Sequence, residues 1–124
     1  MATINITFVP EDDLTIFNVI GDLTVEEILK YSTEYYELKP TKFVMWDATK
    51  GTVKNITTED FRKIATEMKT YTQKRSGGKT ALVGKFDLDF GLSRMYSSYT
   101  EMEQVPIAYG SFYNVDDAMA WLKE

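Results

Sequence analysis

The chain of 124 residues contains neither cysteine nor histidine. Without cysteine it can form no disulfide, no thiolate nucleophile and no sulfur-ligated metal site. Without histidine it can build no Ser-His-Asp or Cys-His catalytic device, and no imidazole can serve as general base or metal ligand. Acid–base chemistry would fall to Asp, Glu, Lys or Tyr side chains with shifted pKa values. We therefore expect that the protein is not an enzyme and that it has no catalytic residue, metal ion or cofactor.

A long apolar run and an excess of basic residues are missing as well. No segment approaches the roughly 20 apolar residues of a membrane helix, and the first ten residues lack the basic and apolar regions of a signal peptide. The net charge of −5 and the pI near 4.8 argue against nucleic acid, which is bound through clustered Lys and Arg. We expect a cytoplasmic protein with no transmembrane segment and no nucleic-acid partner.

One short stretch is nevertheless basic, between residues 69 and 79. It ends an expected helix, and cations are favoured at a helix C-terminus by the macrodipole. We therefore expect these side chains to be solvated there rather than to bind a phosphate. They are Lys69, Lys74, Arg75 and Lys79.

Hydrophobic patterns divide the chain into five strands and four helices. Strands are expected at 3–9, 14–20, 43–46, 79–85 and 107–113, and helices at 24–39, 57–76, 88–105 and 114–122. The connection between the first two strands is too short for a crossover, so they should form an antiparallel hairpin. Later strands alternate with helices, which demands parallel pairing. The sequence predicts one α/β domain over residues 1–124, with a mixed, mostly parallel five-stranded sheet and four helices in the order β-β-α-β-α-β-α-β-α.

Three of the four helices begin with a capping signal, a hydroxyl or amide side chain followed three residues later by an acid. For the remaining helix we expect Asp87 or Asp89 to be the cap. A calcium loop is the alternative reading of residues 87–91, but Ser98 stands where the bidentate glutamate of such a loop belongs. The three pairs are Thr24 with Glu27, Thr57 with Asp60, and Asn114 with Asp117.

The central strands should supply the core. We expect Val44, Leu82 and Val83 to be almost fully buried, because short continuous apolar runs are typical of strands covered on both faces. Residues 47–55 are polar and are expected to form a loop. Asp47 and Gly84 should then lie at the carboxyl ends of adjacent parallel strands, where open α/β sheets place their binding sites.

Aromatic residues make up 14% of the chain, and many lie near the expected ends of helices and strands. Tyr and Trp are common in cores, interfaces and pockets alike, because each joins an apolar ring to a polar atom. We expect most of them to pack in the core and the rest to line a pocket or an interface. The group is Tyr31, Tyr35, Tyr36, Trp46, Phe86, Phe90, Tyr96 and Tyr99.

Three segments resemble the SpoIIAA-like proteins of the STAS/Sec14 grouping, which are relatives of the anti-sigma-factor antagonists. They are a lysine-led strand that runs into glycine (79–84), the chain's ending (112–122), and the entry to the first helix (21–24). The resemblance spans nearly the whole chain. It implies a mixed sheet with helices and with small-ligand or protein-binding surfaces.

The same resemblance draws attention to Thr49. In anti-sigma-factor antagonists a serine that follows an aspartate at the end of the central strand is phosphorylated by a partner kinase. The comparable segment here begins at Asp47, and Thr49 carries its hydroxyl. The segment departs from the family pattern, because threonine replaces serine and residues 52–56 intervene before the helix. Phosphorylation of Thr49 is therefore implied by resemblance alone.

Two hypotheses for function follow, and an enzymatic role through Asp47, Lys85 and nearby tyrosines ranks below both. The first is a non-enzymatic STAS-like interaction or regulatory module, which meets a protein partner or a second copy through the loops after the central strands. The second is a Sec14-like domain that binds or senses a small apolar ligand or lipid, in a cavity of roughly a few hundred Å³. The candidate binding residues are Trp46, Asp47, Thr49, Lys85, Phe86 and Tyr96.

Overall fold

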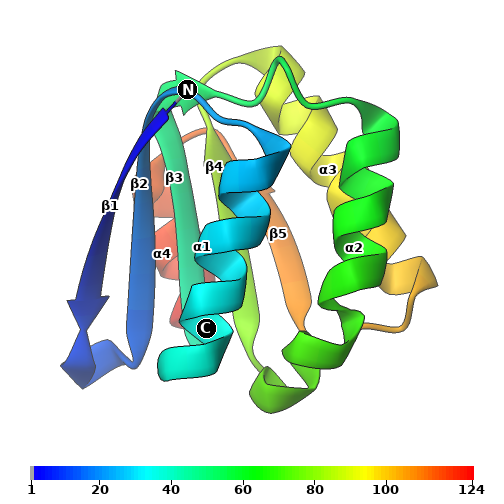
Figure 1. Cartoon of the computed structure of the whole chain (residues 1–124). Helices are drawn as coiled ribbons and strands as arrows, with labels where there is room; N and C mark the ends of the chain where they lie inside the picture. Colours follow the sequence, from blue (N-terminus) through cyan, green and yellow to red (C-terminus); the bar gives the residue numbers. More distant parts are fainter. Residues whose placement is uncertain (1) are drawn as a thin grey trace.

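The computed structural model describes residues 2–124, which form a sheet flanked by helices on both faces (Figure 1). The strands are β1 (Ala2–Val9), β2 (Leu14–Asp22), β3 (Phe43–Thr52), β4 (Lys79–Gly84) and β5 (Ala108–Phe112). The helices are α1 (Val25–Leu38), α2 (Thr58–Thr72), α3 (Asp87–Met102) and α4 (Val115–Leu122), with short 3-10 turns at Pro10–Asp12 and Gln73–Arg75. The order of elements is the one expected from the sequence.

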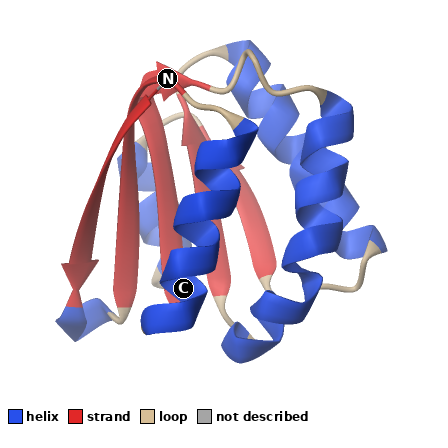
Figure 2. Ribbon diagram, viewed as in Figure 1, coloured by secondary structure: helices blue, strands red, loops and turns tan. Residues whose placement is uncertain are grey.

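The sheet follows the order β1-β2-β3-β4-β5 (Figure 2). The edge strand β1 pairs antiparallel with β2, and every later pair is parallel. This arrangement confirms the mixed, mostly parallel sheet, with β3 at its centre and the first strand as an antiparallel edge.

Helices α1, α2 and α3 cover one face of the sheet, and α4 covers the other (Figure 1). Helices α1, α2 and α3 each connect two neighbouring parallel strands, and right-handed crossovers place all three on the same side. Their buried side chains form one core with that face, whereas α4 packs on the opposite face through Ala118 and Leu122 against Leu14, Met45 and Ala81.

The helix starts agree with the capping signals. Complete capping boxes join Thr24 to Glu27 and Thr57 to Asp60, with each side chain bonded to the other residue's backbone N–H. The Asn114 side chain accepts from the N–H of Asp117 at the start of α4. The fourth expectation was wrong, because Phe86 is the N-cap of α3 and its side chain offers no acceptor.

Strand β3 is longer than predicted, since residues 47–52 continue it instead of forming a loop. Beyond Ala48, which pairs with Gly84 at the end of β4, the strand pairs only with β2. One side of this extension faces no strand, which explains how polar residues are accommodated. Gly51 is required here, because an added Cβ would lie 2.6 Å from the carbonyl oxygen of Gly21. The expected position of Gly84 at the carboxyl end of its strand is confirmed. Asp47, by contrast, lies inside β3 and not at its end.

The expected core is confirmed at Val44 and Val83, which are both buried. It is wrong at Leu82, which is only partly buried. Leu82 packs against the core cluster and also lines a cavity. Among residues 2–124, no helix combines the length and the apolar character needed to cross a membrane.

Candidate ligand-binding cavity

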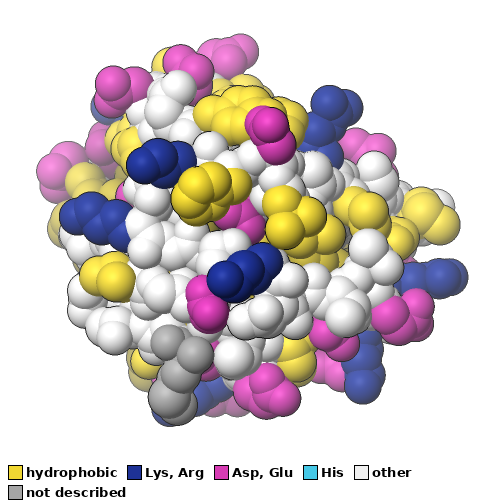
Figure 3. Space-filling model, turned by 90° about the horizontal axis from the view of Figure 1, so that it is seen from above, with side chains coloured by type: hydrophobic (Ala, Val, Ile, Leu, Met, Phe, Trp, Pro, Cys, Tyr) yellow, Lys and Arg dark blue, Asp and Glu magenta, His cyan; other side chains and the backbone are white. Residues whose placement is uncertain are grey.

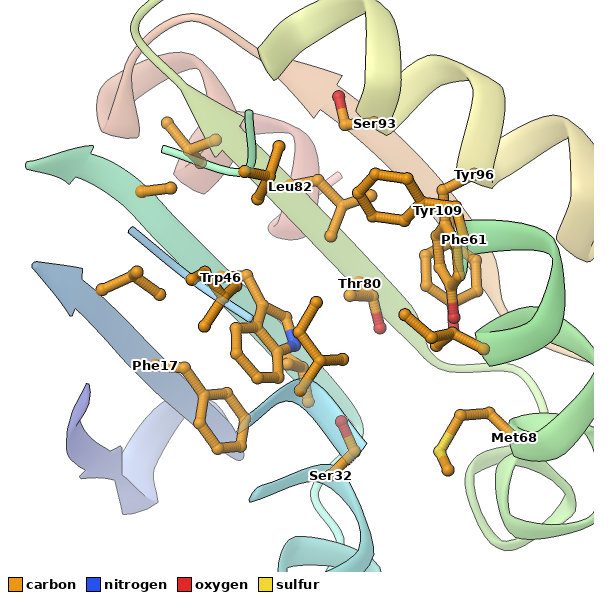
Figure 4. A pocket seen from close by; sticks show the side chains of 18 of the residues that line it. Phe17, Ser32, Trp46, Phe61, Met68, Thr80, Leu82, Ser93, Tyr96 and Tyr109 are labelled. Atoms are coloured by element: carbon orange, nitrogen blue, oxygen red, sulfur yellow. The ribbon is translucent and has the colours of Figure 1, made fainter. Parts of the chain in front are cut away.

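A partly enclosed cavity lies between the sheet and the helices α1, α2 and α3 (Figure 4). Its floor consists of two rows of side chains that run across neighbouring strands. Because paired residues of parallel strands point to the same face, Phe17, Trp46 and Leu82 form one row. The second row is Val44, Thr80 and Tyr109.

The helices supply the roof of the cavity. Ser32 faces it from α1, Phe61 and Met68 face it from α2, and Tyr96 faces it from α3 (Figure 4). Aromatic rings contact one another around the walls. Phe17 and Trp46 stack with their centroids 4.3 Å apart, and the Tyr96 ring meets Phe61 and Tyr109 edge to face.

The cavity has a volume of about 110 Å³, smaller than the few hundred expected from the sequence. An engineered apolar cavity of about 150 Å³ remains dry and binds benzene. The space here is therefore on the scale of one small ring or a short aliphatic molecule, and it is too small for an entire lipid chain.

One lining residue, Arg75, is a buried cation that is only 5% exposed. Its Nε donates to the carbonyl of Thr41 at 2.7 Å, and its Nη2 donates to the carbonyls of Lys42 and Lys79. Its Nη1 donates to the hydroxyls of Tyr36 and Thr80 at 3.1 and 3.0 Å. A guanidinium has five N–H donors, so these bonds occupy all of them.

Three tyrosines near this cation are held in the neutral form. Burial raises the pKa of Tyr36, although Arg75 opposes the rise. Burial also raises the pKa of Tyr96 and of Tyr109, and the proximity of other phenols adds to the effect. Each hydroxyl therefore keeps its proton and can serve as a hydrogen-bond donor.

A second charged side chain, Asp89, lines the cavity from the first turn of α3 and is 3% exposed. Its Oδ1 accepts hydrogen bonds from the Thr52 hydroxyl and the Val53 N–H, each at 2.9 Å. These bonds tie α3 to the end of β3. Its Oδ2 is buried and has no hydrogen-bond partner in the described part of the chain.

The predicted site residues divide into three groups. Trp46 and Tyr96 both line the cavity. Asp47 and Thr49 contact each other on β3, outside the cavity. Lys85 and Phe86 are exposed in the turn between β4 and α3, at the end of the molecule where hydrophobic side chains gather in Figure 3.

Thr49 already has a partner. Its hydroxyl donates to Asp47 Oδ1 at 2.7 Å, its N–H donates to the same atom at 2.9 Å, and its side chain is half-buried. A phosphate there would replace this bond by repulsion between two anions. Phosphorylation of Thr49 stays a prediction, and this contact weighs against it.

Sequence reasoning missed Arg75, Asp89, Thr80 and Tyr109. The sequence predicts a solvated helix end for Arg75 and a helix cap for Asp89, whereas both side chains are buried beside the cavity. Thr80 and Tyr109 carried no signal except their alternation along short strands. No group of three or more acidic side chains in residues 2–124 is arranged to hold a metal ion.

The fold and the cavity define an α/β domain with a mixed five-stranded sheet and three crossover helices on one face. A solved structure with this architecture is an uncharacterized protein of the DUF3478 family with a SpoIIAA-like fold, from Shewanella loihica PV-4. The TM-score is 0.57, the sequence identity is 19%, and the match covers 98% of this chain and 93% of that one. The chain therefore has a SpoIIAA-like fold, as the resemblance implied.

The likeness is one of structure. No protein-family model matches the chain, and no curated protein matches it either. At this level of identity the comparison establishes the fold alone, and the argument for function rests on the cavity.

Proposed function

We propose that this domain binds a small, largely apolar molecule in the cavity between its sheet and helices α1, α2 and α3, without catalysing a reaction. The observation that carries the proposal is the cavity itself, with its walls of aromatic and aliphatic side chains. Protein interiors are packed like organic crystals, and voids larger than a water molecule are few.

Side chains that line a cavity lack packing contacts on the side that faces it. A ligand that fills the space restores those contacts, so ligand binding should stabilise the fold markedly. The absence of histidine and cysteine supports a binding role over an enzymatic one.

Toluene is a suitable first probe, because it is a single apolar ring of about the right size. It should raise the melting temperature of the protein and change the fluorescence of Trp46, which lies in the cavity wall. The measurement is best made with Trp121→Phe, which removes the second tryptophan and leaves the cavity intact.

A matched pair of variants locates the binding. Ser32→Leu places a larger apolar side chain in the cavity from α1, so it should raise the melting temperature without ligand and abolish the response to toluene. Ser98→Leu makes the same change on an exposed position of α3 that does not line the cavity, and it should respond as the wild type does. A toluene response that survives Ser32→Leu would contradict the proposal, and so would the absence of any response to toluene and to its polar derivatives alike.

A second candidate function is protein contact through the turn between β4 and α3. Phe86 in this turn is 55% exposed, and Leu88 in the first turn of α3 is 56% exposed. Exposed apolar side chains that lie together often mark interaction sites. If two copies associate through this turn, analytical ultracentrifugation should show a dimer that Phe86→Ser with Leu88→Ser disrupts. A monomer at all concentrations would remove self-association from consideration.

A further inference from the structure

Asp89, one of the residues that line the cavity, has a side-chain oxygen with unused bonding capacity, its Oδ2. The Asp89 side chain is almost completely buried, and its other oxygen is already bonded to Thr52 and Val53. In the part of the chain that the structure describes, Oδ2 is the one buried side-chain oxygen or nitrogen without a partner. Leaving such an acceptor unpaired is unfavourable, and more so when it belongs to a charged group.

No other residue that lines the cavity donates a hydrogen bond to Oδ2. No lysine or arginine in residues 2–124 forms an ion pair with Asp89. Arg75 is the one cationic side chain among the lining residues, and its five donors are all bonded elsewhere. Arg75 therefore has no free donor for an anionic ligand, whereas Asp89 keeps an unpartnered acceptor for a ligand that donates.

Local packing holds Asp89 in place. An added Cβ on Gly84 would lie 2.7 Å from the Cβ of Asp89, so the carboxyl end of β4 and the first turn of α3 are in close contact. Together with the two bonds to residues 52 and 53, this contact fixes the carboxylate. An acceptor that is fixed in advance loses little entropy when a ligand bonds to it.

We infer that the molecule bound in this cavity is a small amine, with an apolar body of about one ring and an ammonium group that donates to Asp89 Oδ2. The inference rests on the proposed function, since it assigns the chemistry of the ligand in the same cavity. An ammonium offers three donors and a positive charge, and a hydrogen bond between charged groups is stronger than one between neutral groups.

Three probes with one skeleton test the inference, namely toluene, benzyl alcohol and benzylamine. A purely apolar cavity should favour toluene and reject the charged amine, because of the cost of removing an ammonium from water. The wild type should instead bind benzylamine tightest, roughly tenfold or more tighter than toluene. Dissociation constants from NMR titration and from the rise in melting temperature would give the ranking.

Two aspartate variants supply the control. Asp89→Asn keeps an oxygen for Thr52 and Val53 but replaces the free acceptor with an NH2 donor, so benzylamine binding should fall roughly tenfold or more while benzyl alcohol still binds. Asp87→Asn removes the same charge two residues away at an exposed site outside the cavity, and it should bind benzylamine as the wild type does. Circular dichroism and NMR spectra of each variant show whether it is folded.

The outcomes separate this inference from the proposed function. Toluene binding as tight as or tighter than benzylamine in the wild type would overturn the amine assignment and leave the apolar site intact. Equal loss of benzylamine in the two aspartate variants would overturn it too, since the attraction would then be general. If Asp89→Asn unfolds, benzylamine binding to Ser32→Leu decides the matter, because undiminished binding to that filled cavity would place the amine elsewhere. Binding of none of the three probes would overturn the proposed function as well.

Discussion

Arg75 joins segments that are distant in the sequence. Its guanidinium connects the end of α1, the loop before β3 and the start of β4 through five hydrogen bonds, to Tyr36, Thr41, Lys42, Lys79 and Thr80. Burial of a charge costs free energy unless hydrogen bonds compensate for it. Three of the acceptors are backbone carbonyls, and those of Thr41 and Lys42 also accept from the Tyr35 hydroxyl and the Lys79 N–H.

Replacing Arg75 should therefore destabilise the fold strongly. Arg75→Lys cannot reproduce a planar set of five donors, and it should lower the free energy of unfolding by roughly 2–4 kcal/mol, because most of these buried hydrogen bonds are lost. Lys63→Met, at an exposed position of α2, should change it by less than about 0.5 kcal/mol. Urea denaturation measures both, and similar values for the two variants would mean that the Arg75 contacts contribute little.

The sequence could not have identified Arg75 or Asp89 as buried, since their partners lie far along the chain. Arg75 is 34 residues from Thr41, and Asp89 is 37 residues from Thr52. Local patterns describe neighbours within one turn or one strand pair, and at that range both residues look like ordinary surface charges. The role of each depends on which strands the sheet brings together.

At the scale of elements, local signals predicted most boundaries well. The starts of α1, α2 and α4 depend on side chains three residues apart, and these are readable in the sequence. The strand predicted at 43–46 is shorter than β3, because the second half of β3 is polar and pairs only with β2. Polarity reports solvent exposure, and an exposed strand and a loop are alike in that respect.

The start of α1 also carries a pH-dependent contact. The Glu27 carboxylate accepts hydrogen bonds from the N–H groups of Thr24 and Ala2 and from the Thr24 hydroxyl. Partial burial by itself would raise the pKa of Glu27, but these hydrogen bonds outweigh it and hold that pKa below its usual value. The carboxylate thus links the first strand to the first turn of α1.

Because the pKa of Glu27 is lower in the folded state than in the unfolded state, its contribution to stability is present above the unfolded value of about 4.3. That contribution is lost as the pH falls through the lower folded value. Glu27→Gln keeps an acceptor for the capping box but removes the charge, so its stability should fall less steeply with acid. Urea midpoints measured at several acidic pH values test this expectation, and parallel curves for variant and wild type would refute it.

At the scale of the whole molecule, the cavity results from the topology. Three successive right-handed crossovers place α1, α2 and α3 over one face of the sheet, whereas α4 covers the other face with a small, well-buried core. The side chains of the crowded face meet at Tyr36, Tyr96 and Tyr109, around Arg75 and the cavity. Their phenols are therefore removed from water by the fold as a whole and not by any single element.

These three tyrosines should make the protein sensitive to alkali. Burial raises the pKa of each above the usual value of about 10, so their stabilising contribution is complete below about pH 10 and decreases as the pH rises towards the folded values. Tyr96→Phe removes one such group, and its free energy of unfolding should decline less steeply above about pH 10 than that of the wild type. Trp121→Phe, on the opposite face of the sheet with α4, should retain the wild-type slope. Equal slopes for Tyr96→Phe and the wild type would show that the Tyr96 phenol ionises as readily in the folded protein as in the unfolded chain.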